Sequence, residues 1–298
     1  MRTVFLGTSE FAVAVLERLA AGDHRPELVL TRPDRPRGRG RKLGSPPVAQ
    51  AARRLGIAVV QPAKVNEPAA REAIAGARPE AVIVCAFGAL IREPLLSEYE
   101  LLNVHPSLLP RWRGAAPVER AIMAGDARTG VSIMRLTAGL DSGPVCLAQA
   151  EPIEPRDTYG SLAARLQRLG GELLVRALES IAGGEPLQFA EQDELRATYA
   201  EKIGPEDRLL RPTLTALELE RVVRALHPHI GARLALGEDL LGVREARATG
   251  EGPPPGKLTR DGERLLYGAR EGALELLVVQ PPGGRPMDAA AYLRGHAL

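Results

Sequence analysis

The sequence predicts an α/β protein in which an open parallel sheet, covered by helices on both faces, is followed by a small β-barrel. Through the first two thirds of the chain, short apolar runs rich in β-forming residues alternate with amphipathic helical patterns. Several of these runs are apolar throughout, which is typical of strands buried on both faces. In the last third, short strand patterns punctuated by Gly and Pro follow one another, as in small barrels.

The first part of the chain carries the sheet. Its expected strands are residues 3–6, 28–31, 58–61, 81–85, 101–104, 131–136 and 145–150. Its expected helices are residues 10–21, 47–55, 67–75, 116–124 and 159–181. An open sheet of this kind binds its ligands beyond the carboxyl ends of its strands. Polar residues that directly follow a strand are therefore the first candidates for a functional site.

The second part begins after a polar stretch of little periodicity, which indicates a linker. We therefore expect three segments, namely a first domain at residues 1–185, a linker at 186–207 and a second domain at 208–298. The second domain should contain a helix at 216–226, strands at 232–236, 240–246, 256–260, 264–269 and 273–280, and a last helix that Asp288 caps.

Composition and charge narrow the class of protein. With 298 residues, 45% of them hydrophobic, the chain can bury the cores of two domains. The formal net charge is only +2, so affinity for nucleic acid must come from local clusters. Cys85 and Cys146 lie in apolar runs without metal-ligand spacing, so we expect core residues and no metal. With no basic leader and no apolar run near the ~20 residues of a membrane span, we expect a cytoplasmic protein. No long exposed apolar stripe demands a partner, so we expect a monomer.

The most informative segment follows the strand expected at 101–104. Asn103 and His105 are two residues apart, so on a strand their side chains point to the same face. An amide can donate a hydrogen bond to an oxygen that gains negative charge, and an imidazole can donate or accept a proton near neutral pH. The alternative is that the two residues only cap a strand and a turn.

A single acid lies in the Gly-bracketed loop at residues 137–144, which also follows an expected strand. Asp141 placed beside a histidine could orient the imidazole and receive the proton that an amine releases. Alternatively it is an ordinary turn residue, because Asp hydrogen-bonds its own backbone in such loops.

Together these two segments resemble the folate-dependent formyltransferase family, and residues 112–117 and 198–202 match it as well. The resemblance implies a Rossmann-like parallel-sheet formyltransferase domain followed by an OB-like β-barrel domain. It implies 10-formyltetrahydrofolate as the formyl donor, Asn103 and His105 on the formyl oxygen, and Asp141 across from them. Attack by the amine forms a tetrahedral oxyanion that needs such donors. Whether His105 or Asp141 is the final base stays open.

The resemblance also implies folate contacts. The turn after the histidine matches the family's folate-contacting turn at Ser107, Leu108, Leu109 and Pro110, and the wall around the pterin matches at Phe87, Leu90 and Ile91. Phe87 and Leu90 could equally be core side chains. The loop at residues 7–12 matches the family's opening and is not Gly-x-Gly-x-x-Gly, which argues against a nicotinamide site.

A basic segment at residues 32–42 distinguishes between the acceptors that family members use. Clustered arginines can clamp phosphates, although a charge run is often only a solvated face. The segment resembles the loop that family members acting on methionyl-initiator tRNA insert into the acceptor arm. Arg39 is at the position used most directly, and its expected supports are Arg35, Arg37, Arg41 and Lys42.

Three other functions compete with this one. A formyltransferase acting on a nucleotide amino sugar, or a hydrolase of formyltetrahydrofolate, would share the Asn, His and Asp set but would not need the basic loop. A catalytically idle RNA-binding protein would not need the Asn, His and Asp set.

His227 and His229 have metal-like spacing, but the sequence offers no third ligand, so a structural role is expected.

Overall fold

The computed structural model describes residues 1–37 and 42–296, and the backbone alone of Arg37 and Lys42. The chain forms two compact units. Unit 1 contains residues 1–117, 129–151 and 163–200, and unit 2 contains residues 118–128, 152–162 and 201–298. Among the described residues, no helix has the length and apolar character needed to cross a bilayer.

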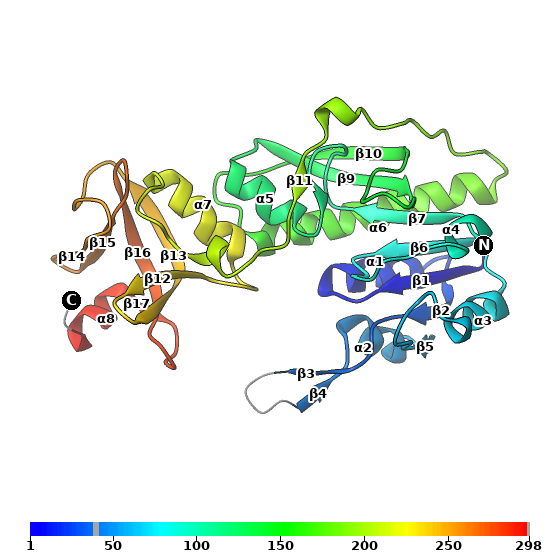
Figure 1. The fold of residues 1–298 in the computed structure, drawn as a ribbon, viewed down its shortest axis with the longest axis horizontal. Coiled ribbons are helices and arrows are strands. Elements are labelled where there is room, and N and C mark those ends of the chain that lie inside the picture. Colours follow the sequence, from blue (N-terminus) through cyan, green and yellow to red (C-terminus); the bar gives the residue numbers. More distant parts are fainter. Residues whose placement is uncertain (38–41, 297–298) are drawn as a thin grey trace. The chain divides into compact units, whose positions relative to one another are not determined.

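Unit 1 is built on a seven-stranded sheet with the order β10-β9-β7-β6-β1-β2-β5 (Figure 1). The strands are β1 (Thr3–Gly7), β2 (Pro26–Leu30), β5 (Ala58–Val60), β6 (Ala81–Cys85), β7 (Leu101–His105), β9 (Arg128–Arg135) and β10 (Val145–Pro152). The helices of unit 1 are α1 (Glu10–Ala20), α2 (Pro47–Arg54), α3 (Pro68–Ala77), α4 (Leu95–Glu98) and most of α6 (Tyr159–Ala182). Helix α5 (Pro117–Ala124), which precedes β9 in the chain, belongs to unit 2 except for Pro117. Every residue of β1, β6 and β7 is buried, which confirms the prediction of a sheet covered on both faces.

One strand departs from the expected direction. β1 pairs in parallel with β2 and β6, and β6 with β7, but β7 and β9 are antiparallel. The backbone N–H of Leu136 donates to the carbonyl of Leu101, so the loop after β9 starts beside the beginning of β7. The expectation that the strand at residues 131–136 is part of a parallel sheet is therefore wrong, and the loop that carries Asp141 begins at the opposite end of β7 from His105.

Unit 2 contains a curled antiparallel sheet of the half-barrel type, where the sequence predicts a small β-barrel. Its order is β12-β13-β16-β15-β14, with β17 paired to β16. The strands are β12 (Ala232–Leu236), β13 (Asp239–Thr249), β14 (Leu258–Asp261), β15 (Arg264–Gly268), β16 (Ala273–Gln280) and β17 (Met287–Asp288). Helix α7 (Ala216–Leu226) begins with a capping box between Thr215 and Glu218, and α8 (Ala289–Gly295) ends the described chain.

A buried carboxylate ties β13, β15 and β16 together. The Glu275 side chain is 8% exposed and accepts from Arg247 at 2.7 Å and Arg264 at 3.1 Å. The hydrogen bond from Arg264, followed by that from Arg247, holds the pKa of Glu275 below its usual value of 4.5. A depressed carboxyl pKa adds stability above pH about 5, and this contribution is lost as the pH falls through the folded-state pKa.

We expect Glu275→Gln to lower the free energy of unfolding at pH 7 by about 2 kcal/mol, because charge-assisted hydrogen bonds are weakened. The difference from the unmutated protein should shrink as the pH falls from 6 to 3. Urea unfolding at several pH values checks this. A pH-independent difference would mean that packing, and not the charge, is responsible.

Candidate active site

Strand β7 carries two polar residues that the sequence singles out. Asn103 and His105 lie two residues apart on it, so their side chains leave the same face of the sheet. They are 7% and 4% exposed. Opposite them on β9 lie Met134 and Ser132, respectively. A buried amide and a buried imidazole thus face one region near the carboxyl end of β7.

Each ring nitrogen of His105 faces a different protein group. Nε2 lies 2.9 Å from the carbonyl oxygen of Trp112. Because a carbonyl oxygen can only accept, Nε2 carries a hydrogen and donates it. Nδ1 lies 3.6 Å from Oδ2 of Asp141. The nitrogen available to gain and lose a proton is therefore Nδ1, and it faces a carboxylate.

The Asp141 carboxylate is fixed by a backbone donor. Its Oδ2 accepts a hydrogen bond of 2.8 Å from the N–H of Gly114. A Cβ at Gly114 would lie 2.8 Å from the carbonyl oxygen of Ala200, and the φ of this glycine is 117°, so a side chain there would be strained. The close approach that only glycine allows thus brings the donor to the carboxylate.

A segment of the expected linker frames this site. The short strands β8 (Arg113–Gly114) and β11 (Tyr199–Ala200) pair in parallel. The Thr198 carbonyl accepts from the N–H of Arg113 at 2.9 Å, and the Thr198 hydroxyl accepts from the N–H of Trp112 at 2.9 Å. Strands of two residues leave no periodicity in a sequence, so periodicity could not predict this pairing.

The amide of Asn103 makes no hydrogen bond to any residue within the described ranges 1–37 and 42–296. Its nitrogen and oxygen are also not among the buried side-chain atoms of the described residues that lack a partner, so these atoms reach the solvent although only 7% of the residue is exposed. The Asn103 amide is therefore available to a ligand that enters the site.

The residues expected to contact folate fall into two groups. Ser107 is fully buried and its hydroxyl donates to the carbonyl of Arg111 at 2.6 Å, so it shapes the turn. Phe87 and Ile91 are both 4% exposed and belong to a hydrophobic cluster of unit 1. The partly or well exposed members are Leu108, Leu109, Pro110 and Leu90, the last with 60% of its surface exposed.

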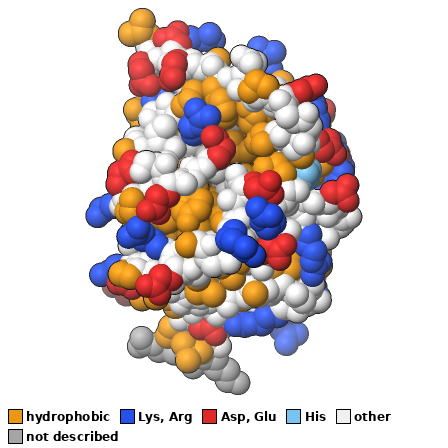
Figure 2. Space-filling model, turned by 90° about the vertical axis from the view of Figure 1, so that its right-hand side faces the viewer, with side chains coloured by type: hydrophobic (Ala, Val, Ile, Leu, Met, Phe, Trp, Pro, Cys, Tyr) orange, Lys and Arg blue, Asp and Glu red, His pale blue; other side chains and the backbone are white. Residues whose placement is uncertain are grey.

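The basic segment forms a hairpin in the part that is described. Strands β3 (Arg35–Arg37) and β4 (Lys42–Gly44) pair antiparallel, and Arg35 is exposed. Arg39 and Arg41 lie outside the described residues. The hairpin also exposes 73% of Leu43, an apolar residue that the sequence did not single out. Figure 2 shows a face of the molecule where acidic and basic side chains are interspersed, in keeping with the formal net charge of only +2.

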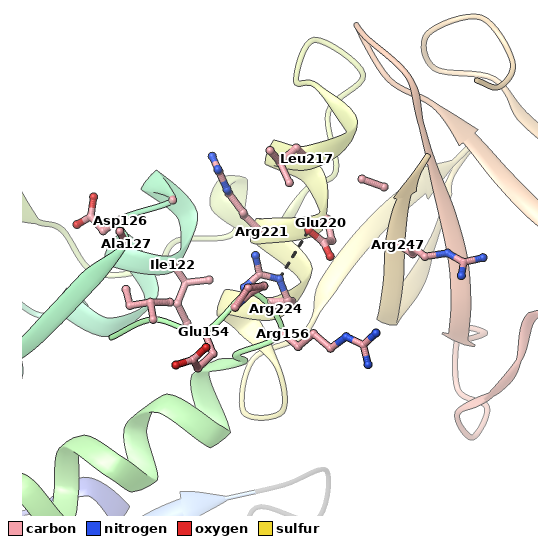
Figure 3. Close-up of a pocket in the computed structure, with 14 residues that line it drawn as sticks. Ile122, Asp126, Ala127, Glu154, Arg156, Leu217, Glu220, Arg221, Arg224 and Arg247 are labelled. Atoms are coloured by element: carbon pink, nitrogen blue, oxygen red, sulfur yellow. Dashed lines mark ion pairs between the residues drawn. The ribbon is translucent and has the colours of Figure 1, made fainter. Parts of the chain in front are cut away.

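Unit 2 contains a cavity of about 540 Å³ that is drawn in Figure 3. Among its lining residues, Arg224 lies 3.7 Å from Glu220, and burial lowers the pKa of this guanidinium. Arg156 and Arg247 point to one side in this view, whereas Arg221 points to the other. Their charges do not converge on one point, and none of the residues that the sequence singled out for a site lines this cavity.

Two family models match the chain. A model described as Formyl transferase matches residues 1–178, and one described as Formyl transferase, C-terminal domain, matches residues 202–297. The chain belongs to the formyl transferase family. The family resemblance that the motifs indicate is thereby confirmed.

This formyl transferase is similar over its whole length to proteins named methionyl-tRNA formyltransferase. It is 44% identical to the one from Halorhodospira halophila, over 100% of this chain and 97% of the relative. It is 42% identical to the one from Herpetosiphon aurantiacus, over 99% of this chain and 98% of the relative.

Solved structures show the same fold at lower identity. The formyl transferase matches HypX from Aquifex aeolicus with a TM-score of 0.70 and 19% identity, over 99% of this chain and 49% of that chain. It matches an N-formyltransferase from Helicobacter canadensis with a TM-score of 0.67 and 15% identity, over 92% of this chain and 98% of that chain. The predicted fold class is therefore confirmed.

The two histidines with metal-like spacing lie in unit 2 of the formyl transferase. The Nε2 atom of His229 lies 2.9 Å from a carboxylate oxygen of Glu119, and its ring stacks on Tyr159 with centroids 3.7 Å apart. No group of three metal-ligating side chains occurs among the residues whose positions are described. The contacts of His229 are those of a packed structural residue.

Proposed function

We propose that this formyl transferase moves the formyl group of 10-formyltetrahydrofolate onto the amino group of methionyl-initiator tRNA, for translation initiation. Relatives that match it end to end bear the name methionyl-tRNA formyltransferase. The observation that carries the proposal is the buried Asn103 amide, which lacks a protein partner within the described ranges, on the same strand as the His105–Asp141 pair. The proposed location is the cytoplasm, and a monomer suffices for the reaction because one chain holds all three residues.

The proposed division of the chain follows the sequence expectation. Residues 1–185 are the catalytic domain, 186–207 the linker, and 208–298 the OB-like domain that binds tRNA. The two family models end at residue 178 and begin at residue 202, and the gap between them overlaps this linker at residues 186–201.

Asn103 is the proposed donor to the formyl oxygen. The folate supplies a formyl carbon that an amine can attack, and the formyl oxygen gains negative charge as the new C–N bond forms. A preorganised N–H donor stabilises such an oxygen more than it stabilises the starting carbonyl. The Asn103 amide fits this role because it is held on a buried strand and has no competing partner among the described residues.

His105 and Asp141 are the proposed proton relay. The attacking amine must lose a proton, and Nδ1 of His105 is the acceptor because Nε2 is committed to the carbonyl of Trp112. The carboxylate of Asp141, 3.6 Å away, stabilises the imidazolium that forms. The same proton then passes to the folate nitrogen as its C–N bond breaks, so both residues return to their initial state.

Folate is proposed to contact the exposed members of the expected set, which are Leu90, Leu108, Leu109 and Pro110. Ser107, Phe87 and Ile91 support this surface from behind, because each is buried. Leu90 and the turn of Leu108, Leu109 and Pro110 offer apolar surface against which the flat pterin ring of folate can pack.

The proposed tRNA contacts are Arg35, Arg37, Arg39, Arg41 and Lys42. For Arg39→Ala, we expect the KM for tRNA to rise on the order of tenfold with kcat little changed, since a phosphate contact acts on binding. The slope of log affinity against log salt should fall by about one.

The matched control is Arg168→Ala, which removes an arginine that is 70% exposed on α6. It should leave both the KM for tRNA and the salt slope unchanged. If the two variants behave alike, the basic segment is only a solvated face.

The direct test of the function is consumption of the donor. Purified protein should convert 10-formyltetrahydrofolate to tetrahydrofolate only when methionyl-initiator tRNA is present. Consumption without any acceptor would indicate a hydrolase and would overturn the proposal.

A further inference from the structure

We infer that Gln192, anchored by Arg113, is a positioning residue that sets the place of Asp141 in the active site. This inference rests on the proposed function, in which the Asp141 carboxylate serves the proton relay. Gln192 lies in the segment that precedes β11, far from Asp141 in the sequence. Its side chain nevertheless contacts two backbone carbonyls, those of Asp141 and Gly143, in the loop at residues 137–144.

All hydrogen-bonding groups of the Gln192 amide are used. Its Nε2 donates to the carbonyl of Asp141 at 2.8 Å and to the carbonyl of Gly143 at 2.7 Å. Its Oε1 accepts from Nε of Arg113 at 3.0 Å. An amide has two N–H donors, so the loop takes both of them and the arginine takes the oxygen.

Arg113 provides a rigid anchor for that amide. Its side chain is only 2% exposed. Charged side chains are buried to this extent almost only when they are paired. Nη1 and Nη2 donate to the two carboxylate oxygens of Glu194 at 2.9 and 2.7 Å, and this hydrogen bonding raises the pKa of Arg113. A bidentate pair fixes the orientation of the guanidinium, and therefore the orientation of Gln192.

The sheet alone does not place Asp141, which is why a positioning residue is needed. The loop starts beside Leu101, at the beginning of β7, whereas His105 is at the end of that strand. The backbone of Asp141 also adopts a φ of 46°, in the left-handed region that most residues other than Gly, Asn and Asp avoid. The side chain of Gln192 donates a hydrogen bond directly to the backbone carbonyl of Asp141.

Two substitutions separate positioning from simple anchoring of the linker. Gln192→Met removes all three hydrogen bonds at similar volume. Gln192→Glu keeps an acceptor for Arg113 but loses both donors to the loop and places a carboxylate against two carbonyl oxygens. If Gln192 positions Asp141, both variants should lower kcat on the order of tenfold to a hundredfold, with little change in either KM. Gln188→Met, at an exposed glutamine of the same linker, is the control and should not change kcat.

A double-mutant cycle supplies the decisive kinetic readout. Because Gln192 acts through Asp141, Gln192→Met should change kcat by less than about twofold in an Asp141→Asn background. A residue that only stabilised the fold would lower activity by the same factor in both backgrounds. The melting temperature of every variant is measured alongside, so that unfolding is not mistaken for loss of positioning.

Amide hydrogen exchange in the protein without substrates gives a readout independent of turnover. Residues 137–144 should exchange faster in both Gln192 variants and not in Gln188→Met. The inference is overturned if Gln192→Glu retains full kcat, if the cycle is additive, or if exchange in the loop is unchanged. The proposed function fails separately, if the unmutated protein formylates no methionyl-tRNA.

Discussion

Replacing Asn103 with alanine is expected to lower kcat for formyl transfer on the order of a hundredfold, while the KM for tRNA changes little. The reason is that an oxyanion donor acts mainly in the transition state. The structure strengthens this expectation, because the amide is buried on β7 and makes no hydrogen bond to the residues that are described. Steady-state kinetics with a fixed donor concentration and varied methionyl-tRNA measure both constants.

The isosteric variant Asn103→Asp refines that result. It keeps the shape of the side chain but replaces the N–H donors by an oxygen that repels a developing negative charge. Its kcat should be no higher than that of Asn103→Ala. A decrease in kcat of less than about threefold in both variants would mean that the Asn103 amide has a structural role and no role in catalysis.

A larger effect is expected for Asp141→Asn, on the order of a thousandfold in kcat, within the range of losses seen when general acid–base partners are disabled. The variant can still accept the hydrogen bond from Gly114 through its amide oxygen, so the loop should stay in place. What it loses is the negative charge that faces Nδ1 of His105. A lower kcat at an unchanged melting temperature would show that the activity is lost with the charge of Asp141 and not with the folded structure.

Because His105 and Asp141 act as one relay, their effects should not multiply. The double variant His105→Ala with Asp141→Asn should be about as slow as His105→Ala alone, since residues that act as a unit are non-additive. Multiplicative losses would show that the two residues serve different steps.

Much of the fold follows from local patterns in the sequence. The helix expected at 216–226 and the strands expected at 232–236, 81–85 and 273–280 have the bounds that the structure shows. These elements have clear periodicity or a clear apolar run, and the first begins with a capping box at Thr215. The facing of Asn103 and His105 follows in the same way from their spacing of two on a strand.

What could not be predicted depends on contacts between distant segments. The antiparallel direction of β9 depends on its pairing with β7 and leaves no mark on its own sequence, so the sequence predicts a parallel strand there. The pairing of β8 with β11 and the contacts of Gln192 with Asp141 join residues about 50 or more positions apart. The exposure of Leu43 could not be predicted either, because nothing in the sequence around a single leucine shows that 73% of its surface is exposed.

The Asn103, His105 and Asp141 site is proposed to transfer a formyl group to an aminoacylated initiator tRNA. Its most direct test supplies donor labelled in the formyl carbon together with equal concentrations of methionyl-initiator tRNA and a nucleotide amino sugar, and follows the label. We expect the label on the methionine amino group of the tRNA, and its absence when Asn103→Ala is used under the same conditions. Label on the amino sugar, or released as formate, would contradict the account.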